Sequence, residues 1–117
     1  MELNEVQFGA QPPIDGYGPG YFRVGDKLVQ GHIFVHAGAA LSWKGLGSWD
    51  SILAAQPEYE ILLIGTGAEI ARLTPQDQTI LDAADIVYEV MASAPAARTY
   101  NVLLSEQRRV AVALLTV

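Results

Sequence analysis

The amino-acid sequence predicts a single α/β domain over residues 1–117. The length of 117 residues suits one domain of about 100 to 200 residues. The first half contains short runs rich in β-branched and aromatic residues between clusters of glycine and proline. In the second half, three apolar runs alternate with two segments that begin with helix-start signals. A β-rich N-terminal half followed by a β-α-β-α-β half is therefore expected.

In the first half, the pattern predicts an edge strand, a loop and a hairpin. Residues 3–8 alternate apolar and polar side chains, as an edge strand does. Residues 11–20 contain three prolines and three glycines, which predicts a loop. The segments 21–24 and 27–35 flank a Gly-Asp turn signal, so they predict the two strands of a hairpin.

The middle of the chain predicts a flexible stretch and a short helix. Residues 38–47 are small and rich in glycine. Ser48 is expected to cap a short helix in which Trp49 and Ile52 share one face, and Pro57 is expected to end it.

The second half gives the clearest signals. Residues 59–64 form an apolar run closed by a Gly-Thr-Gly turn, which predicts a central strand. Thr74, followed by proline and an acid at the third position, predicts a helix to about residue 84. A buried strand over 86–91, a helix over 93–106 and a closing strand over 109–117 follow. Strands joined by such helices run parallel, so the chain leaves Ile64 and Val90 at one edge of the sheet, where ligands usually bind.

Several short motifs resemble one known family. They are EILLIGTG at 60–67, YEVM at 88–91, AARTYNVL at 96–103 with RVA at 109–111, and IDGYG at 14–18 with FRV at 22–24. In order and spacing they resemble the MTH938-like (DUF498/DUF598) family across nearly the whole chain. The resemblance implies a three-layer α/β fold with a mixed central sheet. It also implies an accessory protein, since family members include mitochondrial proteins that assist assembly of respiratory complex I.

The sequence departs from the family pattern at two places. Residues 84–86 read Ala-Asp-Ile where relatives commonly have Gly-Ile, which would change only the end of the helix. Ala97 precedes Arg98 where relatives often have a cysteine, so a thiol role is absent here. The family implies no catalytic residues, and none are assigned.

Composition and charge exclude several classes of partner and chemistry. The net charge of −6 opposes binding to nucleic acid or to anionic membranes. The absence of cysteine removes disulfides, thiolate metal sites and thiol redox chemistry. The N-terminal MELNEVQF lacks the basic start of a signal peptide, and no apolar run is long enough for a membrane span. A cytoplasmic protein is expected.

One polar pocket is predicted at the edge where the parallel strands end. The glycine turn there has two interpretations, a simple chain reversal or a set of backbone donors for an anion. A nucleotide fingerprint is incomplete, because Ile70 stands where a third glycine is needed. Arg98 and Glu89 are expected to converge, either as a buried ion pair or as a site for an anionic ligand. The pocket residues are Gly65, Thr66, Gly67, Glu89, Ser93, Arg98, Tyr100 and Asn101.

A protein interface is predicted at Trp43 and Trp49, which bracket a glycine-rich stretch. Packing of both rings over the sheet is the alternative. His32 and His36 lie in a segment of strand composition, and four residues of strand separate them by about 13 Å, so joint metal binding is excluded. No metal or cofactor is expected.

The function expected from these observations is that of a non-enzymatic accessory protein that docks on another protein, as a monomer or weak homodimer. The alternative is a small-molecule or anion-binding domain, conceivably an enzyme, in which Arg98 fixes an acidic group and Glu89 acts as acid or base.

Overall fold

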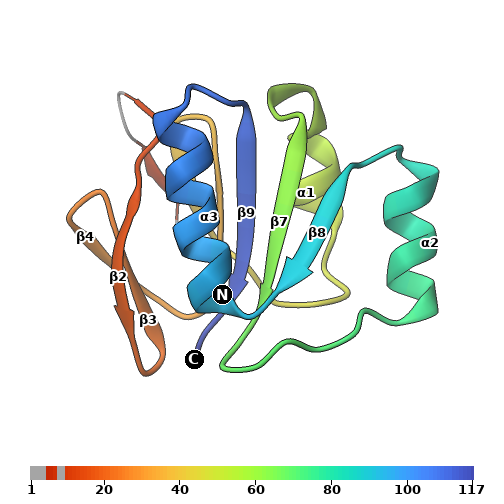
Figure 1. The fold of residues 1–117 in the computed structure, drawn as a ribbon, viewed down its shortest axis with the longest axis horizontal. Helices are drawn as coiled ribbons and strands as arrows, with labels where there is room; N and C mark the ends of the chain where they lie inside the picture. Colours follow the sequence, from red (N-terminus) through yellow and green to blue (C-terminus); the bar gives the residue numbers. More distant parts are fainter. Residues whose placement is uncertain (1–4, 8–9) are drawn as a thin grey trace.

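The computed structural model describes residues 5–7 and 10–117, which form two sheets and three α-helices (Figure 1). The larger sheet has six strands in the order β1-β6-β5-β9-β7-β8. Its strands are β1 (Glu5–Gln7), β5 (Ile33–His36), β6 (Ala39–Ser42), β7 (Ile61–Thr66), β8 (Tyr88–Met91) and β9 (Val110–Leu115). β7 pairs in parallel with β8 and β9, whereas β9 pairs antiparallel with β5, so the sheet is mixed. The β-α-β-α-β half is therefore confirmed.

The position of β8 differs from the expectation of a second buried strand. β8 begins at Tyr88, and it is the outermost strand on its side of the sheet. Its residues are exposed or only partly buried, because no other strand pairs with one side of β8 among the described residues. β7 lies between two strands, as predicted.

The smaller sheet corrects two predictions for the first half. It consists of β2 (Ile14–Gly18), β3 (Tyr21–Val24) and β4 (Lys27–Gln30). β2 lies within the stretch predicted as a loop, since its prolines fall outside the paired residues. The predicted strand over 27–35 is split at Gly31, whose φ of 86° turns the chain from β4 into β5 of the other sheet. Residues 38–47 likewise contain β6, which pairs with β5 and β1.

The hairpin and the first strand agree with the sequence where the structure describes them. β3 and β4 pair around Gly25 and Asp26, whose positive φ values of 53° and 68° suit a tight hairpin turn. β1 pairs with β6 at the far edge of the larger sheet. The rest of the predicted strand over 3–8 lies outside the described residues.

Three α-helices and a 3-10 turn complete the fold. They are α1 (Asp50–Ala54), η1 (Gln56–Glu58), α2 (Pro75–Ala83) and α3 (Ser93–Ser105). Thr74 caps α2 as predicted, since its hydroxyl accepts a hydrogen bond from the Asp77 N–H at 3.0 Å. Ser48 does not cap α1, because Trp49 occupies the N-cap position without a side-chain bond. None of the helices in the described ranges is long and apolar enough to cross a bilayer.

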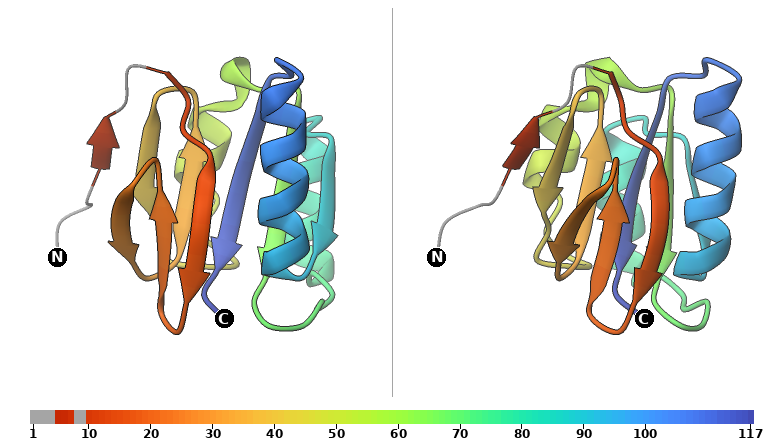
Figure 2. Two further views of the ribbon diagram at one scale, coloured as in Figure 1. Left: turned by 60° about the vertical axis from the view of Figure 1, so that its left-hand side comes forward. Right: turned by 90° about the vertical axis from the view of Figure 1, so that its left-hand side faces the viewer.

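Two hydrophobic clusters join these elements into three layers (Figure 2). On one face of the larger sheet, α3 and the smaller sheet pack against residues such as Leu63 and Val112. On the other face, α1 and α2 pack around Ile64 and Ala113. The predicted three-layer α/β fold with a mixed central sheet is thus confirmed.

Candidate functional site

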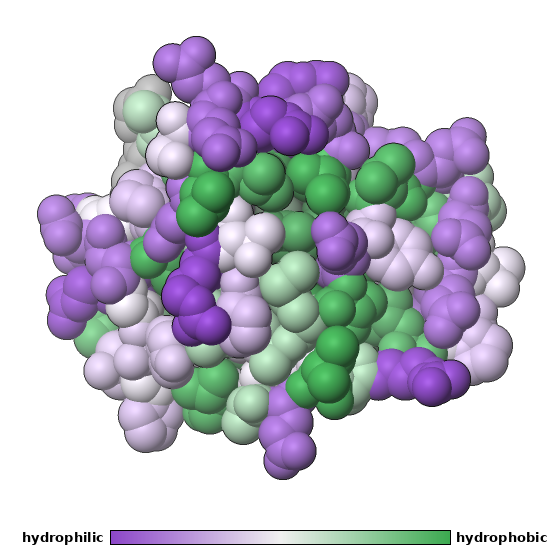
Figure 3. Space-filling view, viewed as in Figure 1, coloured by the Kyte–Doolittle hydropathy of each residue, from purple (hydrophilic) through white to green (hydrophobic). Residues whose placement is uncertain are grey.

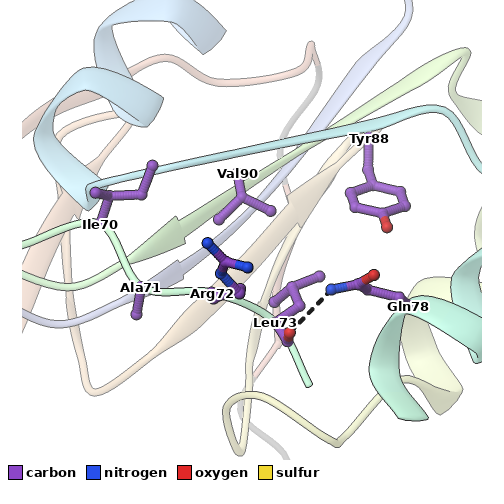
Figure 4. Close-up of a pocket in the computed structure, with 7 residues that line it drawn as sticks. All are labelled: Ile70, Ala71, Arg72, Leu73, Gln78, Tyr88 and Val90. Carbon is purple, nitrogen blue, oxygen red and sulfur yellow. Dashed lines mark hydrogen bonds between the residues drawn. The ribbon is translucent and has the colours of Figure 1, made fainter. Parts of the chain in front are cut away.

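A hollow of about 430 Å³ lies between β8, the segment that leads into α2, and α2 itself (Figure 4). Its size falls in the range of about 300 to 1,000 Å³ that is common for ligand and side-chain pockets. It is lined by Ile70, Ala71, Arg72, Leu73, Gln78, Tyr88 and Val90. Most of this lining is apolar. The hollow borders β8 and the segment that follows β7. It therefore lies beside the ends of these two strands, where the sequence predicts a site.

Apolar side chains also reach the surface at this hollow and on the chain next to it. Ile70, which lines the hollow, is 65% exposed, and Val87, which precedes β8, is 63% exposed. In the space-filling view, apolar residues gather over the region between α3 and α2, and polar residues form its rim (Figure 3). An exposed apolar area with a polar rim is typical of an interaction surface.

Polar groups sit at both ends of the hollow. The Arg72 side chain points into it below Val90 (Figure 4). Gln78 Nε2 donates a hydrogen bond to the Leu73 carbonyl at 3.0 Å, which fixes that amide at the other end. Burial raises the pKa of the Tyr88 hydroxyl, and the nearby Asp82 carboxylate raises it further. The hollow thus has a cation at the Val90 end and an acid near its Tyr88 end.

Three of the predicted pocket residues, Gly65, Gly67 and Ser93, form a contact that joins the end of β7 to the start of α3. Ser93 Oγ accepts a hydrogen bond from the Gly67 N–H at 2.8 Å and donates one to the Leu115 carbonyl at 2.6 Å. Thr66 holds the loop after β7 instead, since its hydroxyl donates to the Glu69 carbonyl at 2.9 Å and accepts from the Ala71 N–H at 2.8 Å. Gly65 allows the close approach, since a Cβ there would lie 2.7 Å from Ser93 Cα. The hydroxyls of Ser93 and Thr66 and the Gly67 N–H are thus hydrogen-bonded to other groups of the protein.

Tyr100 and Asn101 lie farther along α3, where they hold the segment before β2. The Tyr100 hydroxyl is fully buried and donates to the Pro12 carbonyl at 2.6 Å. Burial raises the pKa of this hydroxyl, and a hydrogen bond from Gln11 lowers it in part. Asn101 accepts from the Ile14 N–H and donates to the Ile14 carbonyl, both at 2.8 Å. Both side chains thus stabilise the packing of α3 against the N-terminal segment.

Glu89 and Arg98 do not form the buried ion pair that was one of the two expectations. Both side chains are exposed, and neither takes part in an ion pair among the described residues. None of the eight predicted pocket residues lines the hollow. The residues that do line it were not predicted from the sequence, although Arg72 is the sole base between Asp50 and Glu89.

Trp43 and Trp49 are buried. This agrees with the alternative prediction that both rings pack over the sheet. They are 5% and 3% exposed, with ring centroids 5.9 Å apart. Trp43 Nε1 donates to the Ser48 carbonyl at 2.7 Å, and Trp49 Nε1 donates to Asp77 Oδ1 at 2.9 Å. A partner would therefore contact the residues around these rings and not the rings themselves.

Some of the other titratable groups make local contacts. His36 Nδ1 lies 3.1 Å from Glu58 Oε1, beside a second hollow of about 280 Å³. His32 Nδ1 accepts a hydrogen bond from the Thr116 N–H at 3.0 Å. The hydrogen bond from Arg108 lowers the pKa of the Glu60 carboxyl. No group of three potential metal ligands occurs within residues 5–7 and 10–117.

Several known proteins are similar to this chain. An uncharacterized protein of Rhodobacter capsulatus is 44% identical over 98% of this chain and 93% of its own length. A Xenopus tropicalis protein is named NADH dehydrogenase (ubiquinone) 1 alpha subcomplex assembly factor 3. It is 35% identical to this chain, and the match covers 82% of this chain and 56% of that protein. A Danio rerio protein of the same name is 33% identical over 98% of this chain and 70% of its own length.

Solved structures share the fold. The crystal structure of a Bartonella henselae protein described as an outer membrane protein superimposes with a TM-score of 0.84 at 33% identity, covering 94% of this chain and 99% of that one. The solution structure of a Mth938-like domain from Bordetella pertussis gives a TM-score of 0.70 at 29% identity, covering 98% and 92%. Residues 14–115 match the model for proteins of unknown function of the DUF498/DUF598 family. The chain therefore belongs to the DUF498/DUF598 family.

Proposed function

We propose that this chain is a non-enzymatic accessory protein that binds another protein and assists the assembly of a protein complex. Its similarity to two vertebrate proteins that are named assembly factors of NADH dehydrogenase supports this role. The chain acts as a monomer or weak homodimer, and its partner docks over the hollow beside β8.

The observation that carries the proposal is the exposed apolar lining of this hollow. Ile70 leaves most of its side-chain surface in water, and it lines the hollow together with the apolar side chains of Leu73 and Val90. Covering such a surface with a partner gains about 25 cal/mol for each Å² of apolar area removed from water. A pocket that accepts a side chain is also a typical centre of a protein interface.

The experiment compares two surface substitutions in the organism from which the chain derives. Ile70→Asp places a charge at the hollow, and Leu28→Asp places one on β4, on the opposite side of the molecule in Figure 1. Leu28 is a matched control because it is 51% exposed. Proteins that copurify with each tagged variant are quantified by mass spectrometry against wild type.

We expect the subunits of one complex to copurify with wild type and with Leu28→Asp, and to be lost with Ile70→Asp. Equal recovery with all three proteins would contradict a docking site at the hollow. Thermal melting of both variants checks that the fold is retained, and both positions are exposed enough for a charge to remain solvated.

A second candidate function is the binding of a small anionic molecule in the same hollow. The observation that favours it is the Arg72 guanidinium, which points into the hollow opposite the Tyr88 ring (Figure 4). Guanidinium groups bind carboxylates and phosphates through paired hydrogen bonds. Titration calorimetry with anionic metabolites and nucleotides tests it: binding that Arg72→Ala abolishes and Arg98→Ala retains would support this candidate, and no heat with any compound would contradict it.

A further inference from the structure

One side of β8 presents main-chain groups that no strand of the described residues pairs with. The Leu62 N–H donates to the Val87 carbonyl at 2.9 Å, and Leu62 is the parallel partner of Tyr88. In such a ladder, alternate residues turn their N–H and C=O groups toward the same side. Val87, Glu89 and Met91 therefore face β7, whereas Tyr88 and Val90 turn their main-chain groups outward. No other strand pairs with this side of β8 within the described ranges.

The outward residues are the same two that line the hollow. Tyr88 and Val90 place their side chains along its wall, and their main-chain groups point away from β7. An exposed strand edge normally carries charges, proline or a bulge that prevents pairing with another chain. Here the outward positions carry a tyrosine and a valine, both of which favour strand pairing.

Charges of opposite sign lie at the two ends of this edge. Arg72 points into the hollow at the Val90 end (Figure 4). Asp82 is exposed on α2 and lies close enough to Tyr88 to influence its hydroxyl. A segment lying along β8 would thus meet a base at one end and an acid at the other.

Resting on the proposed function, we propose that β8 accepts an extended segment of the partner protein as an additional strand. The segment pairs with the outward main-chain groups of Tyr88 and Val90 and places an apolar side chain in the hollow. A basic residue of the segment faces Asp82 and an acidic residue faces Arg72. Strand addition of this kind draws affinity from main-chain hydrogen bonds and specificity from pockets for alternate side chains.

A second copy of the chain is a poorer occupant of this edge. Each copy carries a net charge of −6, so association of two copies is opposed by long-range repulsion. Antiparallel pairing of β8 with itself, centred on Glu89, would also set two carboxylates side by side, which destabilises a strand pair.

The variant that tests the pairing is Val90→Pro. Proline lacks the N–H that the added strand would use, yet this N–H makes no bond to β7, so an edge strand tolerates the change. Val90→Thr is the control, because it retains both the branched shape and the N–H. Each variant is compared with wild type by thermal melting before binding is measured.

The probe is a displayed library of random peptides of about twelve residues, selected on the wild-type protein. We expect enriched peptides to share alternating apolar residues between a basic and an acidic residue. Their affinity for Val90→Pro should fall at least about tenfold relative to Val90→Thr, the effect of losing one interfacial hydrogen bond. Enriched peptides with helical spacing, no enrichment, or equal affinities for the two variants would overturn the proposal.

A peptide-based control is independent of whether Val90→Pro folds. The best enriched peptide is synthesised in two forms, N-methylated at either the odd or the even positions of its core. Strand pairing requires that only one form loses binding, since only alternate N–H groups face β8. If both forms bind equally, or if sedimentation shows a wild-type dimer that Val90→Pro dissociates, the proposed occupant is wrong. Those results leave the copurification test of the accessory function unaffected.

Discussion

Trp49 donates its indole N–H to the buried Asp77 carboxylate at 2.9 Å, and this bond joins the start of α1 to the first turn of α2. Asp77 is 7% exposed, and its own N–H is held by the cap residue Thr74. The sequence predicted Thr74 as a helix cap, and Trp49 either as part of a protein interface or as packed over the sheet. In the structure the two signals belong to one arrangement that positions α2 beside the hollow.

Replacing Asp77 should therefore loosen α2. We expect Asp77→Ala to lower the free energy of unfolding by about 1.5 to 3 kcal/mol, because a buried indole N–H loses a charged acceptor. Asp77→Asn should recover part of the loss, since its amide oxygen can still accept. Asp82→Ala, on the exposed side of the same helix, should change stability by less than about 0.5 kcal/mol. Urea denaturation measures all three, and equal stability of Asp77→Ala and Asp82→Ala would contradict the role of this bond.

The contact between β7 and α3 should not tolerate a side chain at Gly65. A Cβ there would lie 2.5 Å from Leu114 Cδ2 and 2.7 Å from Ser93 Cα. We expect Gly65→Ala to destabilise the fold by about 1 to 3 kcal/mol or more, because a main-chain atom must move. Gly16→Ala is the control, since no atom lies within 4 Å of a Cβ built at that position. If the two variants melt at the same temperature, the inferred close packing of Gly65 against Ser93 and Leu114 is wrong.

Stability should fall at alkaline pH. Burial raises the pKa of the Tyr59 hydroxyl from 10.0 to about 12. Burial also raises the pKa of Tyr100. The folded state thus holds these protons more tightly than the unfolded state. Their stabilisation is complete below pH 10 and is lost as the pH rises through the folded-state pKa values.

The loss should amount to at most about 1.4 kcal/mol per pH unit for each tyrosine. Urea denaturation between pH 9 and about 12 measures it. Tyr59→Phe and Tyr100→Phe should each flatten the decline, although both lower stability at neutral pH because the Ile52 and Pro12 carbonyls lose their donors. Tyr17→Phe, at an exposed position, should leave the decline unchanged.

Much of the fold could be predicted because its signals are local. Thr74 and Pro75 start α2, and the apolar run forms β7. Each of these signals depends only on residues close to it in the sequence. β2 was missed because its pairing with β3 starts directly after two prolines, which on their own favour a loop. The split between β4 and β5 depends on which sheet each strand joins, and no local signal at Gly31 encodes that choice.

The residues that line the hollow could not be predicted from the sequence, for a related reason. Topology correctly placed the ends of β7 and β8 at one edge, but it did not show which side chains are already bonded within the protein. Ser93 and Asn101 bond to residues 22 and 87 positions away in the sequence. The hollow depends on how far α2 stands from β8, a distance that the sequence pattern does not specify.

The measurement that tests the central claim most directly is site-specific photo-crosslinking in the organism from which the chain derives. A photoreactive phenylalanine analogue replaces Ile70 beside the hollow or, as the control, Leu28 on β4, and adducts are identified by mass spectrometry. The accessory role predicts one dominant protein adduct from position 70, with a crosslinked partner peptide that carries alternating apolar residues, and no such adduct from position 28. The same adducts from both positions, or none from position 70, would contradict it.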